Sequence, residues 1–151
     1  MPPWVWWLLG GLALLGAVLA AIGIPRARRR RAWDASLAAA EREVQWLARE
    51  LLPMLQQSES ADEVAGGWRV EADRVTRAED RLTGLEPTAP DEVRAGRARA
   101  LRDAVRAARH DVESLIVSRD STTAPRNLAV IAAQVSAALD PPGRADRMHD
   151  G

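Results

Sequence analysis

The stretch WDASLAAAEREVQWLARELLPM, residues 33–54, decides the fold class, because its apolar residues recur at every third or fourth position. These apolar positions are Trp33, Leu37, Ala40, Val44, Leu47, Leu51 and Met54. Such heptad spacing predicts an amphipathic helix with one apolar seam. Pro53 lacks a backbone N–H, so we expect the helix to kink there or to end shortly afterwards, within QQSES at residues 56–60.

A second helix is predicted to start at Ser60, whose hydroxyl can cap the N–H of Glu63 while the Glu63 side chain reaches back. Its apolar seam comprises Ala61, Val64, Trp68, Ala72, Val75, Ala78, Leu82 and Leu85. Gly66 and Gly67 cost about 1 kcal/mol each relative to alanine, so we expect the first turns to be frayed or separate. The TGLEPTAP stretch, residues 83–90, is expected to end this helix.

Thr88 and Asp91 frame the predicted start of a third helix, which has Pro90 in its first turn and ends near Ser118. Its seam comprises Ala98, Leu101, Val105, Ala108, Val112 and Leu115. The SRDSTTAPRN stretch, residues 118–127, predicts a loop before a short fourth helix. The apolar positions of the fourth helix are Leu128, Ile131, Val135 and Leu139. Residues 140–151, which contain DPPG and alternating charges, predict a disordered tail.

Each predicted helix is apolar along only one stripe and must bury that stripe against another helix. The connections are short, which favours antiparallel neighbours. We therefore expect an all-α fold in which residues 33–139 form a small antiparallel helical bundle, with three longer helices and one short helix. A long coiled coil between subunits is the alternative, although Pro53, the two glycines and Pro87 keep each apolar run short.

The N-terminal part of the chain has a different character from the bundle. Residues 4–24 carry no charge over 21 positions, and roughly 20 apolar residues are enough to span a bilayer as a helix. We therefore predict a transmembrane helix at residues 4–24, preceded by a short extracytoplasmic N-terminus at residues 1–3. A basic juxtamembrane segment, residues 25–32, follows the apolar stretch, and we call it the basic segment.

Aromatic and basic residues at opposite ends of this stretch predict its orientation. The predicted membrane-interface residues are Trp4, Trp6, Trp7, Arg26, Arg28, Arg29, Arg30 and Arg31. Tryptophan suits the interface, and arginine is retained on the side where the lipid is anionic and the membrane potential is negative. We expect a single-pass protein of the cell (inner) membrane, with its N-terminus outside and its C-terminal domain in the cytoplasm. Its arginines would contact anionic phospholipid headgroups.

Two other interpretations of the N-terminal part are disfavoured. A cleaved signal peptide would carry basic residues before a shorter apolar run, although Val18, Leu19 and Ala20 make a passable cleavage site. Nucleic-acid binding is disfavoured because the basic segment has no interleaved aromatic residues for base stacking. Small residues at Ala13, Ala17 and Ala21 leave a homo-oligomer through the membrane helix as an open possibility.

The charge distribution suggests a possible partner surface. Residues 32–86 hold 12 acidic residues and 6 arginines, whereas residues 91–126 hold 6 acidic residues and 8 arginines. Four arginines form a stripe along the third predicted helix, beside its apolar seam: Arg99, Arg102, Arg106 and Arg109. It either binds an acidic partner or pairs with acidic residues of the neighbouring helix such as Asp73, Glu79 and Asp80. Trp46, beside the seam, either packs on the next helix or anchors a partner.

The sequence contains no catalytic motif. It has no cysteine, which excludes disulfides, thiolate catalysis and cysteine-ligated metals. Its two histidines, His110 and His149, lack the spacing of zinc peptidases or of di-iron bundles. We therefore expect no enzyme, no cofactor and no metal.

These observations favour a membrane-anchored helical protein-interaction or scaffolding module at the cytoplasmic face of the membrane, with an unidentified protein partner. The alternative is an accessory or regulatory subunit of a membrane transport or envelope-assembly complex, in which the membrane helix itself makes the contact. An enzyme is the least favoured of the three.

Overall fold

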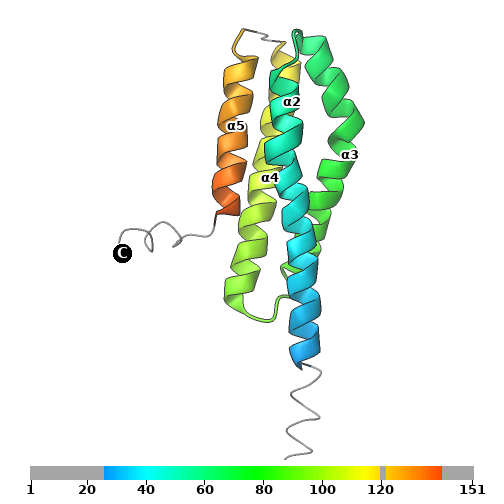
Figure 1. Ribbon diagram of the computed structural model, residues 1–151, viewed down its shortest axis with the longest axis vertical. Coiled ribbons are helices and arrows are strands. Elements are labelled where there is room, and N and C mark those ends of the chain that lie inside the picture. Colours follow the sequence, from blue (N-terminus) through cyan, green and yellow to red (C-terminus); the bar gives the residue numbers. More distant parts are fainter. Residues whose placement is uncertain (1–25, 120–121, 141–151) are drawn as a thin grey trace, which may run out of the picture.

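The computed structural model describes residues 26–119 and 122–140, and these residues form an all-helical bundle in which successive helices run in opposite directions (Figure 1). The first helix, residues 26–56, contains the π-helical segment η1 (Leu47–Leu51) and ends in α2 (Leu52–Gln56). It is followed by α3 (Ala61–Leu85), α4 (Glu92–Ser118) and α5 (Ala124–Leu139). The prediction of an all-α bundle with three longer helices and one short helix is confirmed within the described residues. The predicted membrane helix and the predicted disordered tail beyond residue 140 lie outside them.

The π-helical segment changes which side chains the first helix buries. The N–H of Leu52 donates to the carbonyl of Leu47, five residues back, directly before Pro53, which has no N–H to donate. This wider turn adds one residue to the repeat, so that Leu52 and Leu55 are buried. Met54 is 50% exposed, and its predicted place on the seam is wrong. The helix ends at Gln56, as the proline predicted.

Helix α3 begins at the predicted cap and continues without a break. The Ser60 hydroxyl accepts from the N–H of Glu63 at 3.2 Å, and the Glu63 carboxylate accepts from the N–H of Glu59 at 2.8 Å. The predicted fraying at the two glycines is wrong, since α3 is helical through both. A Cβ atom on Gly67 would lie 2.9 Å from Cδ2 of Leu55, so α3 approaches the first helix too closely there for a larger residue.

The two remaining helices differ from prediction at their starts. Asp91 caps α4 by accepting from the N–H of Arg94 at 3.0 Å, so Pro90 precedes the cap instead of lying in the first turn. Arg119 ends α4 in the left-handed conformation, with φ of 52°. Helix α5 begins at Ala124, inside the predicted loop, because proline at the adjacent position suits a first helical turn.

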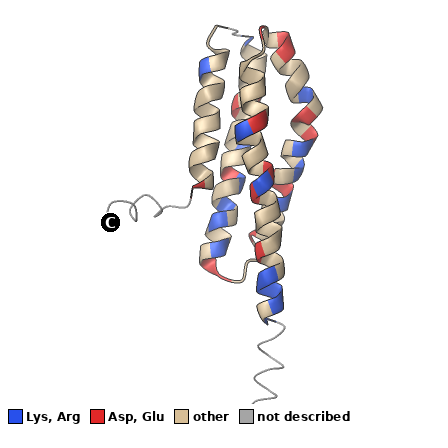
Figure 2. Ribbon diagram, in the orientation of Figure 1, with Lys and Arg blue, Asp and Glu red and all other residues tan. Residues whose placement is uncertain are grey.

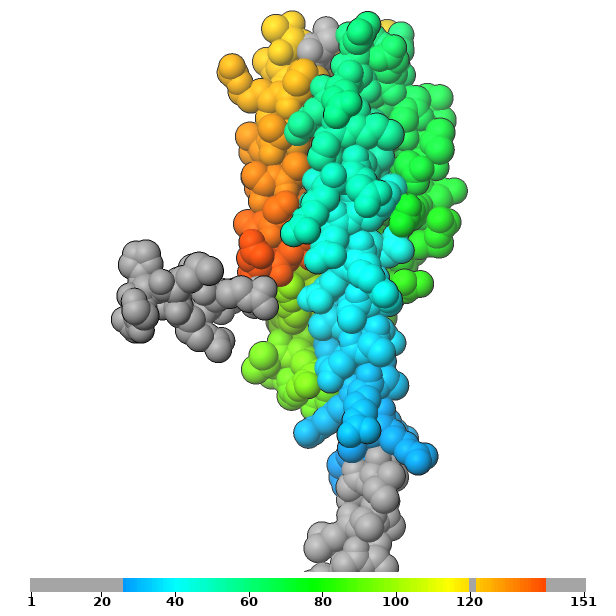
Figure 3. Space-filling model, in the orientation of Figure 1, coloured from blue at the N-terminus to red at the C-terminus, as the bar shows by residue number. Residues whose placement is uncertain are grey.

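The core lies along the middle of the bundle, where the apolar seams of the four helices meet. Its largest fully buried side chains are Leu47, Leu51, Leu52, Leu55, Leu82, Leu101, Leu128, Val44, Val75, Val105, Val112 and Val135. Helices α3 and α4 pack along each other, while α5 packs on α2, η1 and α4. Helix α5 covers only one half of the bundle, and the other half is built from three helices (Figures 1 and 3).

Candidate functional site

The basic segment forms one end of the bundle, and its arginine side chains are exposed to solvent. Its described residues are helical and exposed, and they continue directly into the core-forming part of the first helix. Figure 2 shows this basic end below the connection between α3 and α4. None of the ion pairs found among the described residues involves Arg26, Arg28, Arg29, Arg30 or Arg31. The predicted interface tryptophans, Trp4, Trp6 and Trp7, lie outside the described residues.

The carboxylates at this end are paired with arginines of α4. Arg94 Nε lies 2.7 Å from Asp34, and Arg94 Nη1 lies 2.5 Å from Asp91. Glu86 pairs with Arg99 at 2.7 Å and also with Arg102. The described arginines of the basic segment form no ion pair with these carboxylates, although the charge of Arg30 helps to lower the pKa of Asp34 and Asp91.

Hydrogen bonds from arginine keep these carboxyl groups charged. The pKa of Asp34 is lowered chiefly by the side-chain hydrogen bond from Arg94, against an opposing effect of burial. The pKa of Asp91 is lowered by the backbone N–H of Arg94 and then by its guanidinium. The pKa of Glu86 is lowered chiefly by the hydrogen bond from Arg99. Each hydrogen bond favours the ionised form of the carboxyl group.

A cavity of about 280 Å³ lies between the basic segment and the α3–α4 connection. Its lining residues are Arg26, Arg29, Arg30, Trp33, Thr88 and Pro90. Trp33 is fixed there because its Nε1–H donates to the carbonyl of Leu85 at 3.0 Å. The Thr88 hydroxyl donates to the same carbonyl at 3.1 Å, which fixes the loop against the indole. Sequence reasoning placed Trp33 in the core and treated Thr88 as part of a helix start, so it missed this cavity.

The arginine stripe of α4 faces α3. Arg106 Nε lies 2.7 Å from Glu79, and Arg109 Nε lies 3.1 Å from the other oxygen of the same carboxylate. Glu79 is only 7% exposed, and the two arginines supply the hydrogen bonds that a buried carboxylate needs. Arg99 and Arg102 pair with Glu86, as described above. This geometry matches pairing between neighbouring helices, and Glu79 is one of the three acidic residues named from the sequence.

Trp46 contacts α3, as the first of its two interpretations expects. Its side chain is partly buried against the core. The guanidinium carbon of Arg74 lies 3.7 Å from the centre of its ring, at a distance typical of a cation–π interaction. Arg74 Nε also lies 2.7 Å from the Glu43 carboxylate. Apolar periodicity does not single out Arg74, since Arg74 lies off the seam of α3.

A larger cavity lies at the end of α5. It measures about 830 Å³ and lies between the first helix, α4 and the last residues of α5. Arg97 spans it, pairing with Glu41 at 2.9 Å and donating to the carbonyl of Leu139 at 2.7 Å. Val93, which is 84% exposed, lies on its α4 side.

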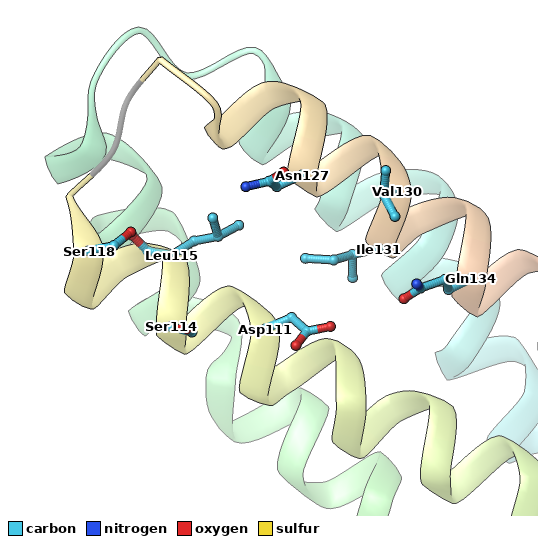
Figure 4. Close-up of a pocket in the computed structure, with 8 residues that line it drawn as sticks. All are labelled: Asp111, Ser114, Leu115, Ser118, Asn127, Val130, Ile131 and Gln134. Carbon is cyan, nitrogen blue, oxygen red and sulfur yellow. The ribbon is translucent and has the colours of Figure 1, made fainter.

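A third cavity, of about 310 Å³, lies between the C-terminal half of α4 and α5 (Figure 4). Asp111, Ser114 and Ser118 reach it from α4, and Asn127 and Gln134 reach it from α5. Leu115, Val130 and Ile131 complete its lining. The neighbouring His110 is exposed.

Neither a metal-binding cluster nor a membrane-spanning helix is found among the described residues. No group of three or more histidine, aspartate or glutamate side chains there is arranged to hold a metal ion. No helix in that part of the chain has the length and apolar character needed to cross a membrane.

No model of a known protein family, no curated protein and no solved structure matches this chain.

Proposed function

We propose that this chain is a membrane-anchored helical protein-interaction or scaffolding module, held at the cytoplasmic face of the membrane by residues 4–24. The proposal is carried by one observation. The basic segment is not a separate linker, because it is helical and belongs to the same first helix that supplies Trp33, Val44 and Leu47 to the core.

This continuity has a geometric consequence for an anchored bundle. A helix rises 1.5 Å per residue, so residues 26–56 extend over about 45 Å. The α3–α4 connection lies at the basic end, and the other connections lie at the opposite end (Figure 1). An anchored bundle would therefore present its distal end at a set height above the membrane, which suits a scaffold.

The excess arginine of the basic segment supports the proposed orientation. Basic residues next to a membrane helix are retained on the cytoplasmic side. A reporter that is active only outside the cytoplasm, fused after Gly151, should stay silent, whereas a cytoplasmic reporter at the same site should be active. Activity of the first reporter would contradict the proposed orientation.

A second experiment separates a scaffold from an accessory subunit of a membrane complex. Residues 4–24 are replaced by an unrelated membrane helix of equal length, and the bound proteins are purified from mild detergent. A scaffold should keep the partner of the native chain, because the bundle makes the contact. Loss of that partner, with the bundle still folded, would favour the accessory subunit.

A further inference from the structure

Three arginines of the basic segment form one face of the first helix. Arg26, Arg29 and Arg30 are spaced by three and four residues, the spacing that brings side chains to one side of a helix. All three line the cavity that Trp33 and the α3–α4 connection complete. Arg28 and Arg31 are exposed on the same segment but do not line it. The structure therefore divides the basic segment into two sets of arginines.

The cavity is suited to an anion. Asp34, Glu86 and Asp91, the nearby carboxylates, are already bound by arginines of α4. Guanidinium groups match the planar, paired oxygens of phosphate and bind them through charge-assisted hydrogen bonds. A volume of about 280 Å³ has room for a phosphoryl group together with a small part of the molecule that carries it.

The position of these arginines along the chain indicates the source of the anion. If residues 4–24 span the hydrocarbon layer, a rise of 1.5 Å per residue puts Arg26 about 3 Å, and Arg30 about 9 Å, beyond its edge. The headgroup layer on each side of a bilayer is roughly 5–8 Å thick. Arg26 and Arg29 would then lie within the headgroup layer and Arg30 at its outer edge, so the three guanidinium groups could reach phospholipid phosphate.

We propose that this cavity binds the phosphoryl group of one anionic phospholipid through Arg26, Arg29 and Arg30, while Arg28 and Arg31 contribute only diffuse attraction to the membrane surface. The proposal deepens the proposed function and rests on it, since it needs residues 4–24 in the membrane.

The test uses the full chain in maltoside micelles, which contain no phosphate. Phosphatidylglycerol, phosphatidylcholine and the soluble ester glycerol 3-phosphate are titrated separately, and native mass spectrometry counts the molecules bound per chain. The cavity variant carries Arg26→Gln, Arg29→Gln and Arg30→Gln. The matched control carries Arg28→Gln, Arg31→Gln and Arg42→Gln, which removes the same charge from exposed positions outside the cavity.

We expect one tightly bound phosphatidylglycerol on the native chain and weaker binding of phosphatidylcholine. The cavity variant should lose affinity for phosphatidylglycerol by at least about tenfold, and the control by no more than about threefold. Equal losses in the two variants would overturn the site, because diffuse charge would then explain the binding. Displacement of the lipid by glycerol 3-phosphate at equal concentration would overturn the lipid as the source.

Failure of this site is distinguishable from failure of the proposed function. Alkaline carbonate extraction of cell membranes tests the anchor without reference to the cavity. A chain that resists extraction but binds lipid equally in both variants would refute the site alone. A chain that carbonate removes would refute the anchor.

Discussion

At the scale of single residues, arginine is the main polar connector between helices. Glu79 is buried and accepts from Arg106 and Arg109, so two cations on α4 stabilise one carboxylate of α3. Arg97 links the first helix to the last carbonyls of α5. The planar guanidinium has five donors and can serve two acceptors at once, which a lysine ammonium does with less geometric definition. This geometry explains how the four arginines of the α4 stripe pair with the carboxylates of Glu79 and Glu86.

The pairing of Arg94 with two carboxylates makes the stability of the bundle depend on pH. It holds the pKa of Asp34 and Asp91 below their ordinary values in the folded chain. A carboxyl group with a lowered pKa stabilises the fold fully above its unfolded pKa, and this stabilisation is lost as the pH falls through the folded pKa. The free energy of unfolding of the fragment 26–140 should therefore decrease from about pH 5 to about pH 2.

Arg94→Gln tests whether Arg94 causes this pH dependence. The substitution removes the charged donor, so the free energy of unfolding should decrease less steeply as the pH falls. Chemical denaturation at a series of pH values measures the slope. Arg42→Gln, at an exposed position outside the ion pairs found in the described residues, is the control and should keep the native slope. Equal slopes for all three proteins would show that Arg94 does not set the pKa of these carboxyl groups.

At the scale of elements, the close contact at Gly67 offers a matched comparison with its neighbour. A Cβ at Gly66 would meet nothing within 4 Å, whereas a Cβ at Gly67 would meet the buried Leu55 side chain at 2.9 Å. Gly66→Ala should raise the free energy of unfolding by about 0.5–1 kcal/mol, because alanine is the better helix former. The free energy of unfolding of Gly67→Ala should be about 1–2 kcal/mol lower than that of Gly66→Ala, because the added methyl group overpacks the core. Urea denaturation measures both variants. An equal rise in the free energy of unfolding of Gly66→Ala and Gly67→Ala would contradict the close approach of α3 to the first helix.

The same glycines show what sequence reasoning could and could not predict. Periodicity and caps predicted the four helices, the start of α3 and most of the core, because these are local signals. Helix propensity suggested fraying at Gly66 and Gly67, but packing of α3 on the first helix decides that region. A regular heptad repeat also cannot predict a π-helical segment. The repeat therefore placed Met54 on the buried seam, whereas the structure buries Leu55. The cavity at the basic end joins residues 26–33 to residues 88–90, a contact that only the tertiary structure reveals.

At the scale of the whole molecule, the short α5 divides the bundle into two halves. The half with α5 is a four-helix bundle, and the half next to the basic segment consists of the first helix, α3 and α4 (Figures 1 and 3). Leu128, Ile131 and Val135 of α5 are buried. Arg97 binds the carbonyls at the end of α5, so the helix is held both by packing and by a charged cap.

The fragment 26–140 should be helical by circular dichroism and should unfold cooperatively, because its seams bury one another without lipid. Removing α5, in the fragment 26–119, takes away three buried apolar side chains that contribute about 1.5–3 kcal/mol each. That sum approaches the whole stability of a small domain, about 5–15 kcal/mol, so the shorter fragment should melt at a much lower temperature or without cooperativity. The fragment 33–140 is the control, since it lacks only exposed residues of the basic segment and should keep a cooperative transition. Equal melting temperatures for 26–140 and 26–119 would mean that three helices suffice for the core and that α5 is a detachable arm.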